Sequence, residues 1–128
     1  MSSLKLLIVD DSAMMRAMIK RAIAMTGVSV DIREASNGRD ALEVLEHDTV
    51  DVVFTDINMP VMTGTELLRE MTVRGWRHIQ RVVISTDNSD ARHDEARQLD
   101  VSLYISKPFA PEAVRDVLTH LSGSADAR

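Results

Sequence analysis

Three aspartates stand at the ends of two apolar segments of the sequence. Asp10 and Asp11 follow the run 4–9, and Asp56 follows the run 51–55. Carboxylates gathered in one small space repel one another, and a cation relieves that repulsion. Mg²⁺ favours carboxylate oxygen, water and phosphate oxygen as ligands. These residue types therefore predict a magnesium site if the fold brings the three aspartates together.

A lysine and two hydroxyl groups follow two later apolar segments. Lys107 comes shortly after the run 103–105, and Ser85 and Thr86 come directly after the run 81–84. Lys107 would bring a fixed positive charge to the aspartates, and one of the hydroxyls would bring a hydrogen-bond donor. An acidic metal site with a lysine and a hydroxyl is a set of groups suited to phosphoryl transfer.

Within this set, Asp56 is the better candidate for a nucleophile because it stands alone at the end of a central strand. The adjacent pair Asp10 and Asp11 would then hold the metal. Taken alone, that pair would be a turn or a strand end, but the company of Asp56 and Lys107 favours the metal site. Cysteine is absent and no histidine follows these apolar runs, so a zinc site is disfavoured.

Positioning these groups requires a regular alternation of elements. We predict strands at 4–9, 28–32, 51–55, 81–84 and 103–105, with helices between Ser12 and Gly27 and over 41–45, 65–73, 90–99 and 111–121. Strict alternation predicts an α/β fold, in which a parallel sheet carries helices on both faces. The loops at the carboxyl ends of parallel strands share one edge, where ligands bind. All the groups named above belong to that edge.

The composition limits the class of protein. The chain of 128 residues has the size of one domain, which we place at 1–121, followed by a polar tail at 122–128. The absence of cysteine excludes disulfides. A net charge of -5 disfavours direct binding of nucleic acid. No apolar segment is long enough for a membrane span and the N-terminus lacks a signal-peptide pattern, so we expect a cytoplasmic protein without membrane contact.

The groups at the strand ends lie in four short segments. With their neighbours they are Val9-Asp10-Asp11-Ser12, Asp56-Ile57-Asn58-Met59-Pro60, Ser85 and Lys107-Pro108-Phe109. Taken in this order, they resemble the receiver domains of response regulators, and in particular the single-domain CheY-like type, over about residues 4–121. The resemblance implies a (βα)5 fold of the flavodoxin and CheY type with strand order 2-1-3-4-5.

The resemblance also implies roles for the acidic residues. Asp56 would accept a phosphoryl group from a histidine kinase, a phosphotransfer protein or a small phosphodonor of a two-component system. Asp11, Asp56 and the backbone carbonyl of Asn58 would contact Mg²⁺, and Asp10 would hold a metal-bound water. Asn58 and Asp87 stand where the family tunes dephosphorylation.

The remaining implied roles concern the phosphate and the switch. Lys107 would bridge to the phosphate and form a cis peptide bond with Pro108, Ser85 would move toward the phosphoryl group, and Tyr104 would turn inward with it. The activated domain would bind an effector through the surface of 90–99, 103–105 and 111–121, and the single-domain form suggests chemotaxis. Thr86 departs from the small residue usual in the family, so we expect it to narrow the access of phosphodonors.

Several alternatives stay open at this stage. Ser85 and Thr86 fit equally a helix cap, Tyr104 fits an ordinary strand aromatic, and the charged run 87–97 fits a plain solvated helix. We interpret the methionines at 14, 15 and 18 as core, the four histidines as surface residues, and Trp76 as remote from the site. A metal-dependent phosphohydrolase and a scaffold with a vestigial site are the other function classes. Asn58 argues against the first because a general acid is lacking there, and the intact acidic set argues against the second.

Overall fold

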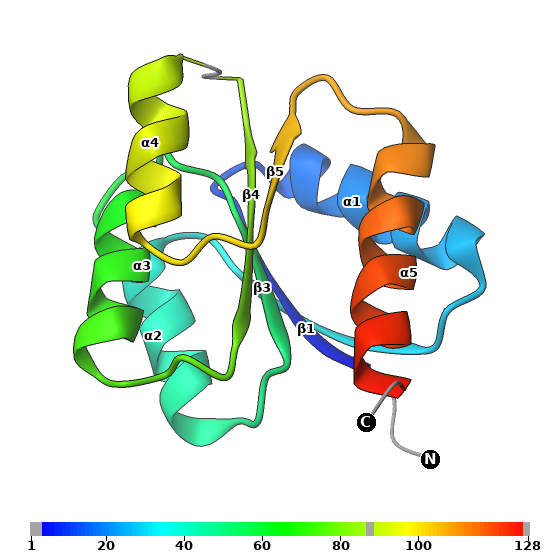
Figure 1. Cartoon of the computed structure of the whole chain (residues 1–128), viewed down its shortest axis with the longest axis horizontal. Helices are drawn as coiled ribbons and strands as arrows, with labels where there is room; N and C mark the ends of the chain where they lie inside the picture. The colour runs from blue at the N-terminus through cyan, green and yellow to red at the C-terminus, as the bar shows by residue number, and fades with distance from the viewer. Residues whose placement is uncertain (1–3, 87–88, 127–128) are drawn as a thin grey trace.

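Strands and helices alternate through the computed structural model, which describes residues 4–86 and 89–126 (Figure 1). The strands are β1 (Leu4–Val9), β2 (Val30–Ala35), β3 (Val52–Thr55), β4 (Gln80–Ser85) and β5 (Leu103–Ser106). The helices are α1 (Ala13–Thr26), α2 (Gly38–His47), α3 (Gly64–Val73), α4 (Asp90–Gln98) and α5 (Pro111–Asp126). The alternation predicted from the apolar pattern is confirmed.

The strands form one parallel sheet with the order β2-β1-β3-β4-β5. This confirms both the predicted fold class and the strand order that the resemblance implied. On one face of the sheet α1 packs against α5, and on the other face α2 packs against α3, with α4 beside them (Figure 1). Because all strands run the same way, their carboxyl ends meet at one edge.

Each face of the sheet has its own apolar core, and successive residues of a strand contribute side chains to the two cores in turn. In β1, Leu7 and Val9 belong to the cluster under α2 and α3, while Leu6 and Ile8 belong to the cluster under α1 and α5. All four are at most 1% exposed. A strand segment buried on both faces needs apolar residues at every position, which is why β1 is apolar throughout its buried part, Leu6 to Val9.

Short polar residues start the helices. Ser12 accepts a hydrogen bond from the Met15 amide at the start of α1. Thr63 forms a capping box with Glu66 at the start of α3, in which each side chain accepts from the other residue's amide. At the far end of α1, Gly27 takes φ 77°, the left-handed conformation that a glycine adopts without strain.

Three elements differ from the prediction by two or more residues at one end or both. The strand β2 begins at Val30 instead of 28, since the Thr26 hydroxyl accepts from the Val28 amide and prolongs the turn after α1. The helix α2 begins at Gly38, because Asn37 caps it by accepting from the Asp40 amide. Finally, α5 continues to Asp126, so most of the segment 122–128 that we predicted as a polar tail is helical.

The prediction that the methionines of α1 belong to the core is wrong for two of them. Met14 is 75% exposed and Met18 is 49% exposed, whereas Met15 is half-buried. The helix buries the stripe that continues from Met15 through Ile19 to Ile23 at spacings of four residues, which turns Met14 and Met18 toward water.

Within the described residues, none of the helices is both long and apolar enough to cross a membrane.

A buried arginine ties α3 and α4 together at the amino end of β4. Arg81 is 1% exposed. Its guanidinium donates to four acceptors on the surrounding segments, namely the carbonyls of Leu68, Trp76 and Leu99 and the hydroxyl of Thr72. Burial lowers the pKa of Arg81, and no carboxylate is among these acceptors. Neutral oxygens from three segments thus satisfy this cation, which had no place in the predicted core.

Candidate functional site

The sheet itself brings the three aspartates together. The Asp10 amide donates to the Ala35 carbonyl at 3.1 Å, and the Asp56 amide donates to the Val9 carbonyl at 3.0 Å. Both residues therefore continue the hydrogen-bond ladder by one position beyond β1 and β3. Asp10, Asp11 and Asp56 each offer a carboxylate oxygen within 4.8 Å of the others. The predicted acidic cluster exists, and rigid strands position two of its three members.

Lys107 bridges two of these carboxylates. Its ammonium nitrogen lies 2.9 Å from Oδ2 of Asp56 and 3.1 Å from Oδ2 of Asp10. The second oxygen of each carboxylate accepts from a backbone amide, Oδ1 of Asp56 from Ile57 at 2.7 Å and Oδ1 of Asp10 from Ser12 at 2.9 Å. The carboxylates are therefore held at both oxygens, and the lysine is oriented by two opposite charges.

The backbone after β5 fixes where Lys107 stands. Its amide donates to the Ser85 carbonyl at 2.9 Å, so the β4–β5 pairing continues to the site. The peptide bond from Lys107 to Pro108 is cis, as the resemblance implied. Burial acts to lower the pKa of Lys107, but hydrogen bonds and charge from Asp56 and Asp10 outweigh it and raise the pKa above 10.5. The lysine is therefore a fixed cation near neutral pH.

The site carries more negative than positive charge. Lys107 faces three carboxylates, of which Asp10 is buried, Asp56 half-buried and Asp11 exposed. Their oxygens suit a hard divalent cation such as Mg²⁺, which prefers oxygen ligands and keeps several waters. Because Asp11 opens to solvent, a hydrated ion could enter from that side. The residues present therefore fit the predicted magnesium site.

The two hydroxyl residues after β4 differ in environment. Ser85 is fully buried at the end of the strand, and Thr86 is exposed. The alternative that one of them caps α4 is wrong, since the cap is Ser89, whose hydroxyl accepts from the Arg92 amide. Ser85 is thus a buried hydroxyl at the site edge without a capping role. Asp87, for which we expected an effect on phosphate lifetime, lies outside the described residues.

Sequence reasoning missed Gly64, the first residue of α3. Its amide donates to the Ile57 carbonyl at 2.8 Å, which draws the start of α3 against the end of β3. A Cβ at this position would lie 1.9 Å from the Asp56 carbonyl oxygen, so only glycine fits. The available signal was a glycine directly after the capping Thr63, within one short loop of Asp56.

Arg16 of α1 also escaped the sequence analysis. Its guanidinium donates to the Asp10 carbonyl at 2.6 Å and pairs with Glu34 of β2 at 2.9 Å. Lys20, one turn further along α1, pairs with the same glutamate. These contacts fasten α1 to β2 and hold the backbone that carries Asp10 and Asp11. A basic residue one turn into the first helix was the only sequence signal.

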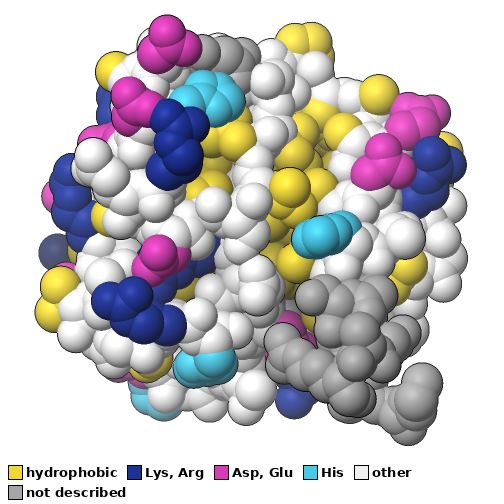
Figure 2. Space-filling model, in the orientation of Figure 1, with side chains coloured by type: hydrophobic (Ala, Val, Ile, Leu, Met, Phe, Trp, Pro, Cys, Tyr) yellow, Lys and Arg dark blue, Asp and Glu magenta, His cyan; other side chains and the backbone are white. Residues whose placement is uncertain are grey.

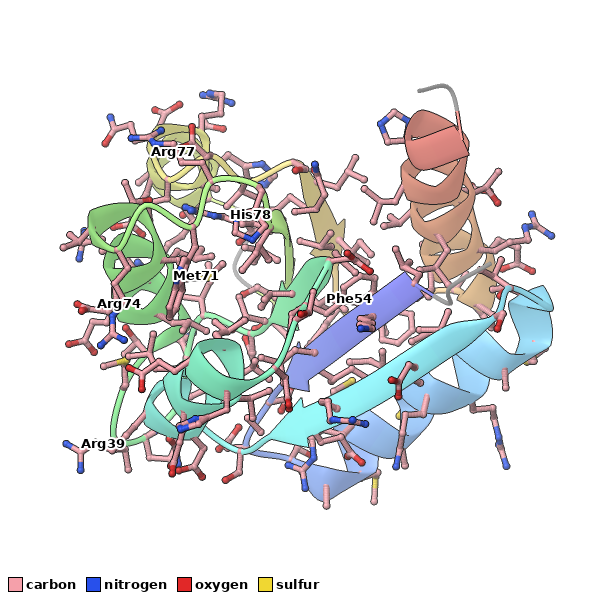
Figure 3. All side chains as sticks on the ribbon, turned by 90° about the horizontal axis from the view of Figure 1, so that it is seen from below. Arg39, Phe54, Met71, Arg74, Arg77 and His78 are labelled. Atoms are coloured by element: carbon pink, nitrogen blue, oxygen red, sulfur yellow. The ribbon has the colours of Figure 1, made fainter. Side chains whose placement is uncertain are left out.

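Tyr104 lies near the acidic site, whereas Trp76 lies far from it. Tyr104 pairs with Val83 in the sheet, two positions before Ser85, and its ring stacks on His93 at 4.2 Å. Trp76 precedes β4, at the opposite edge of the sheet, which agrees with the prediction that it is remote. It packs under the Arg74 guanidinium at 5.3 Å. Figure 3 places Arg74 and Arg77 on the α3 side, away from Phe54 in the sheet.

The geometry agrees with what comparisons with known proteins find. Residues 6–119 match the response regulator receiver domain family. The chemotaxis protein CheY1 of Helicobacter pylori (strain J99) is 34% identical over 125 residues, covering 96% of this chain and 100% of that protein. The chemotaxis protein CheY of Thermotoga maritima is 36% identical over 118 residues, covering 92% and 97%.

The solved structures agree as well. The chemotaxis response regulator CheY4 of Vibrio cholerae superposes with a TM-score of 0.82 at 29% identity, covering 94% of this chain and 99% of that one. The similarity therefore extends over nearly the whole chain in both sequence and fold.

Proposed function

Since the chain belongs to the response regulator receiver family, we propose that it is a signalling switch in which Asp56 accepts a phosphoryl group. The observation that supports this role is the pair of contacts at Asp56, with Lys107 on one oxygen and the Ile57 amide on the other, inside a cluster of three carboxylates. Receiver domains of this family carry no separate catalytic activity, so the product of the reaction is the phosphorylated protein itself.

In the proposed transfer, a carboxylate oxygen of Asp56 attacks the phosphorus of a phosphohistidine. A new oxygen–phosphorus bond forms, and the phosphorus–nitrogen bond of the donor breaks with its electron pair left on the imidazole, which takes up a proton. Lys107 neutralises charge that develops on the phosphoryl oxygens, because its ammonium already lies within hydrogen-bond distance of Asp56. The Ile57 amide holds the carboxylate in place for the attack.

Asp10, Asp11, Asp56 and the backbone carbonyl of Asn58 are the groups we propose to hold Mg²⁺. When bound, the ion would neutralise charge on the phosphoryl oxygens. Asp10 is buried and shares Lys107 with Asp56, so the orientation of its carboxylate is fixed. Asp11 is exposed and can adjust to an arriving ion.

Phosphorylation would act on output through the residues beside the site. Ser85, buried at the end of β4, is the proposed hydroxyl donor to the phosphoryl group, and Tyr104 is proposed to turn with it. Thr86, exposed at the same loop, would control the access of phosphodonors. The transfer would thus bias two conformations of the α4, β5 and α5 surface, of which one binds an effector better.

We propose a histidine kinase or a phosphotransfer protein as the donor and an effector protein as the partner, in the cytoplasm and without direct contact to nucleic acid. The relatives named above are chemotaxis proteins, and their full-length coverage favours a chemotaxis circuit for this chain. We place the receiver domain at 1–121, which contains the whole of the family match at residues 6–119.

Beryllofluoride with Mg²⁺ imitates the phosphorylated aspartate and tests this proposal. We expect NMR shifts of amides around Asp56, Ser85 and Tyr104, which disappear in Asp56→Asn. The control is Asp116→Asn, since Asp116 is exposed on α5 and is not a member of the acidic cluster. A wild-type spectrum that does not change with beryllofluoride and Mg²⁺ would rule out Asp56 as acceptor.

A further inference from the structure

Tyr104 lies on the same face of the sheet as Ser85. Tyr104 of β5 pairs with Val83 of β4, and Val83 belongs to the apolar cluster under α2 and α3. Tyr104 packs against this same cluster with a half-buried side chain. Because side chains alternate along a strand, Ser85 points to the face that carries Val83 and Tyr104. The tyrosine ring and the buried hydroxyl are therefore neighbours along one face.

A histidine of α4 covers the tyrosine. The imidazole of His93 stacks on the Tyr104 ring, with 4.2 Å between ring centroids and an interplanar angle of 26°. His93 is itself half-buried, so it lies at the surface as predicted but has one face of its ring covered by Tyr104. The stack joins α4 to β5, the two elements that border the proposed output surface.

Phosphorylation of Asp56 would change the contacts that its carboxylate makes. Both oxygens of Asp56 are engaged, one by the Ile57 amide and the other by Lys107. Neither contact can persist unchanged at an oxygen that forms a bond to phosphorus. A phosphoryl group on Asp56 would therefore change the contacts at this edge of the sheet, and Tyr104 is the side chain that we propose turns in response.

We infer that His93 is a positioning residue that holds Tyr104 in this arrangement and so sets how readily the switch turns. The inference rests on the proposed function, because it assumes that Tyr104 turns when Asp56 carries phosphate. A rotation of Tyr104 about its Cα–Cβ bond would break the stack, because His93 belongs to α4 and does not turn with the Tyr104 ring. The contribution of an aromatic pair corresponds to about threefold to tenfold in the equilibrium constant between two conformations.

The outer side of the imidazole faces a charged hollow on α4. Figure 2 shows a histidine beside acidic and basic side chains on this side of the molecule, and the hollow is lined by Asp90, His93, Asp94 and Arg97. Asp94 and Arg97 pair with each other. The inner side of the ring thus contacts Tyr104 while the outer side meets a polar surface. An effector that covers this hollow would contact the residue that holds the tyrosine.

The chain contains a single tyrosine, which makes Tyr104 directly observable. In protein made with fluorinated tyrosine, fluorine NMR gives one signal that reports its surroundings. We would titrate beryllofluoride with Mg²⁺ into the wild type, His93→Ala, His93→Phe and the control His120→Ala, which alters an exposed histidine of α5. Amide spectra recorded in parallel report the state of Asp56 and the integrity of the fold.

In the absence of beryllofluoride, we expect the fluorine signal of His93→Ala to lie closer than that of the wild type to the position seen with beryllofluoride. The substitution should also lower the concentration needed for half-conversion about threefold to tenfold, as removal of one aromatic pair predicts. His93→Phe, which restores an aromatic face, and His120→Ala should behave like the wild type. This rescue would show that an aromatic ring at position 93 sets the midpoint, while the amide spectra show that the fold is intact in each variant.

Two results would overturn the inference while leaving the proposed function intact. In the first, amides around Asp56 respond to beryllofluoride but the midpoint is the same in His93→Ala and in the wild type. In the second, the phenylalanine variant shifts as far as the alanine variant. Wild-type amides around Asp56 that stay silent would instead reject the proposed function, and with it the switch on which the inference rests.

Discussion

Two cations stand at opposite ends of the sheet, and they are satisfied in different ways. Lys107, at the carboxyl edge, donates to the carboxylates of Asp10 and Asp56. Arg81, at the amino edge, donates only to neutral oxygens, namely the carbonyls of Leu68, Trp76 and Leu99 and the hydroxyl of Thr72. The region around Lys107 therefore contains several charged side chains in contact with one another, whereas the region around Arg81 contains one charge bonded to neutral groups.

The difference separates a reactive region from a structural one. Around Lys107, three carboxylates exceed one cation, and this excess of negative charge fits the divalent cation that we propose for the site. Around Arg81, each bond comes from backbone or from a threonine of the same helices, and a new partner would leave buried acceptors unsatisfied. The following predictions test this contrast.

The largest effect is expected from Arg81→Met. The substitution removes the donor of four acceptors while filling similar space, so the free energy of unfolding should fall by about 4 kcal/mol. Urea denaturation measures this loss, with Arg39→Met as a control at an exposed arginine. A loss under about 1 kcal/mol would mean that Arg81 is not the tie between α3 and α4.

A methyl group at Gly64 should damage the acidic edge. Its Cβ would lie 1.9 Å from the Asp56 carbonyl oxygen, so we expect Gly64→Ala to cost about 3 kcal/mol and to weaken Mg²⁺ binding. Gly75, in the loop near Arg81, is the matched control, since nothing lies within 4 Å of the position that an added methyl group would take there. Only its φ of 77° opposes alanine, at about 1 kcal/mol. Equal losses of stability in urea denaturation would contradict the tight contact.

Lys107→Met should separate the two regions by their response to metal. Without Mg²⁺, Asp10 and Asp56 lose the cation that they share, and we expect a loss of about 1–2 kcal/mol in unfolding free energy. Saturating Mg²⁺ should restore most of it, because the ion binds only the folded site. The loss caused by Arg81→Met should not respond to Mg²⁺. Thermal unfolding with and without the ion measures both, and a Lys107→Met loss that ignores Mg²⁺ would contradict a metal site here.

The smallest effect concerns an exposed ion pair between α1 and the edge strand β2. Lys20, followed by Arg16, lowers the pKa of Glu34 below 4.5, although slight burial opposes this. A lowered pKa means that the stabilisation is present above the unfolded value and is lost as pH falls through the folded value. Glu34→Gln should therefore cost about 0.5 kcal/mol near neutral pH, and this cost should disappear once the pH lies below the folded pKa of Glu34. Thermal midpoints of both proteins at the two pH values test this, and a difference that persists in acid would contradict the pairing.

The acidic site was predictable because its residues follow apolar runs directly. Asp10 and Asp56 each come one residue after a strand, and parallel strands end at a common edge. Lys107 follows the same rule at β5. No contact between distant residues had to be known, since the topology alone brings these positions together.

The roles of residues that depend on packing could not be predicted from the sequence. Met14 and Met15 are adjacent and chemically identical, yet one is 75% exposed and the other half-buried, because one residue turns a helix position by about 100°. His93 looked like any surface histidine until α4 was placed over Tyr104. Gly64 looked like an ordinary glycine at the start of a helix.

By itself, the sequence determined the alternation of elements, the parallel sheet and the residues at its carboxyl edge, since periodicity and strand ends are local properties of the chain. Only the tertiary structure decided which hydrogen bonds Lys107 makes, that Arg81 is buried among neutral oxygens, and that His93 stacks on Tyr104. These outcomes depend on the distance between elements and on the rotation of each helix about its axis. Both are set by how side chains fill the space between helices and sheet, which no single segment encodes.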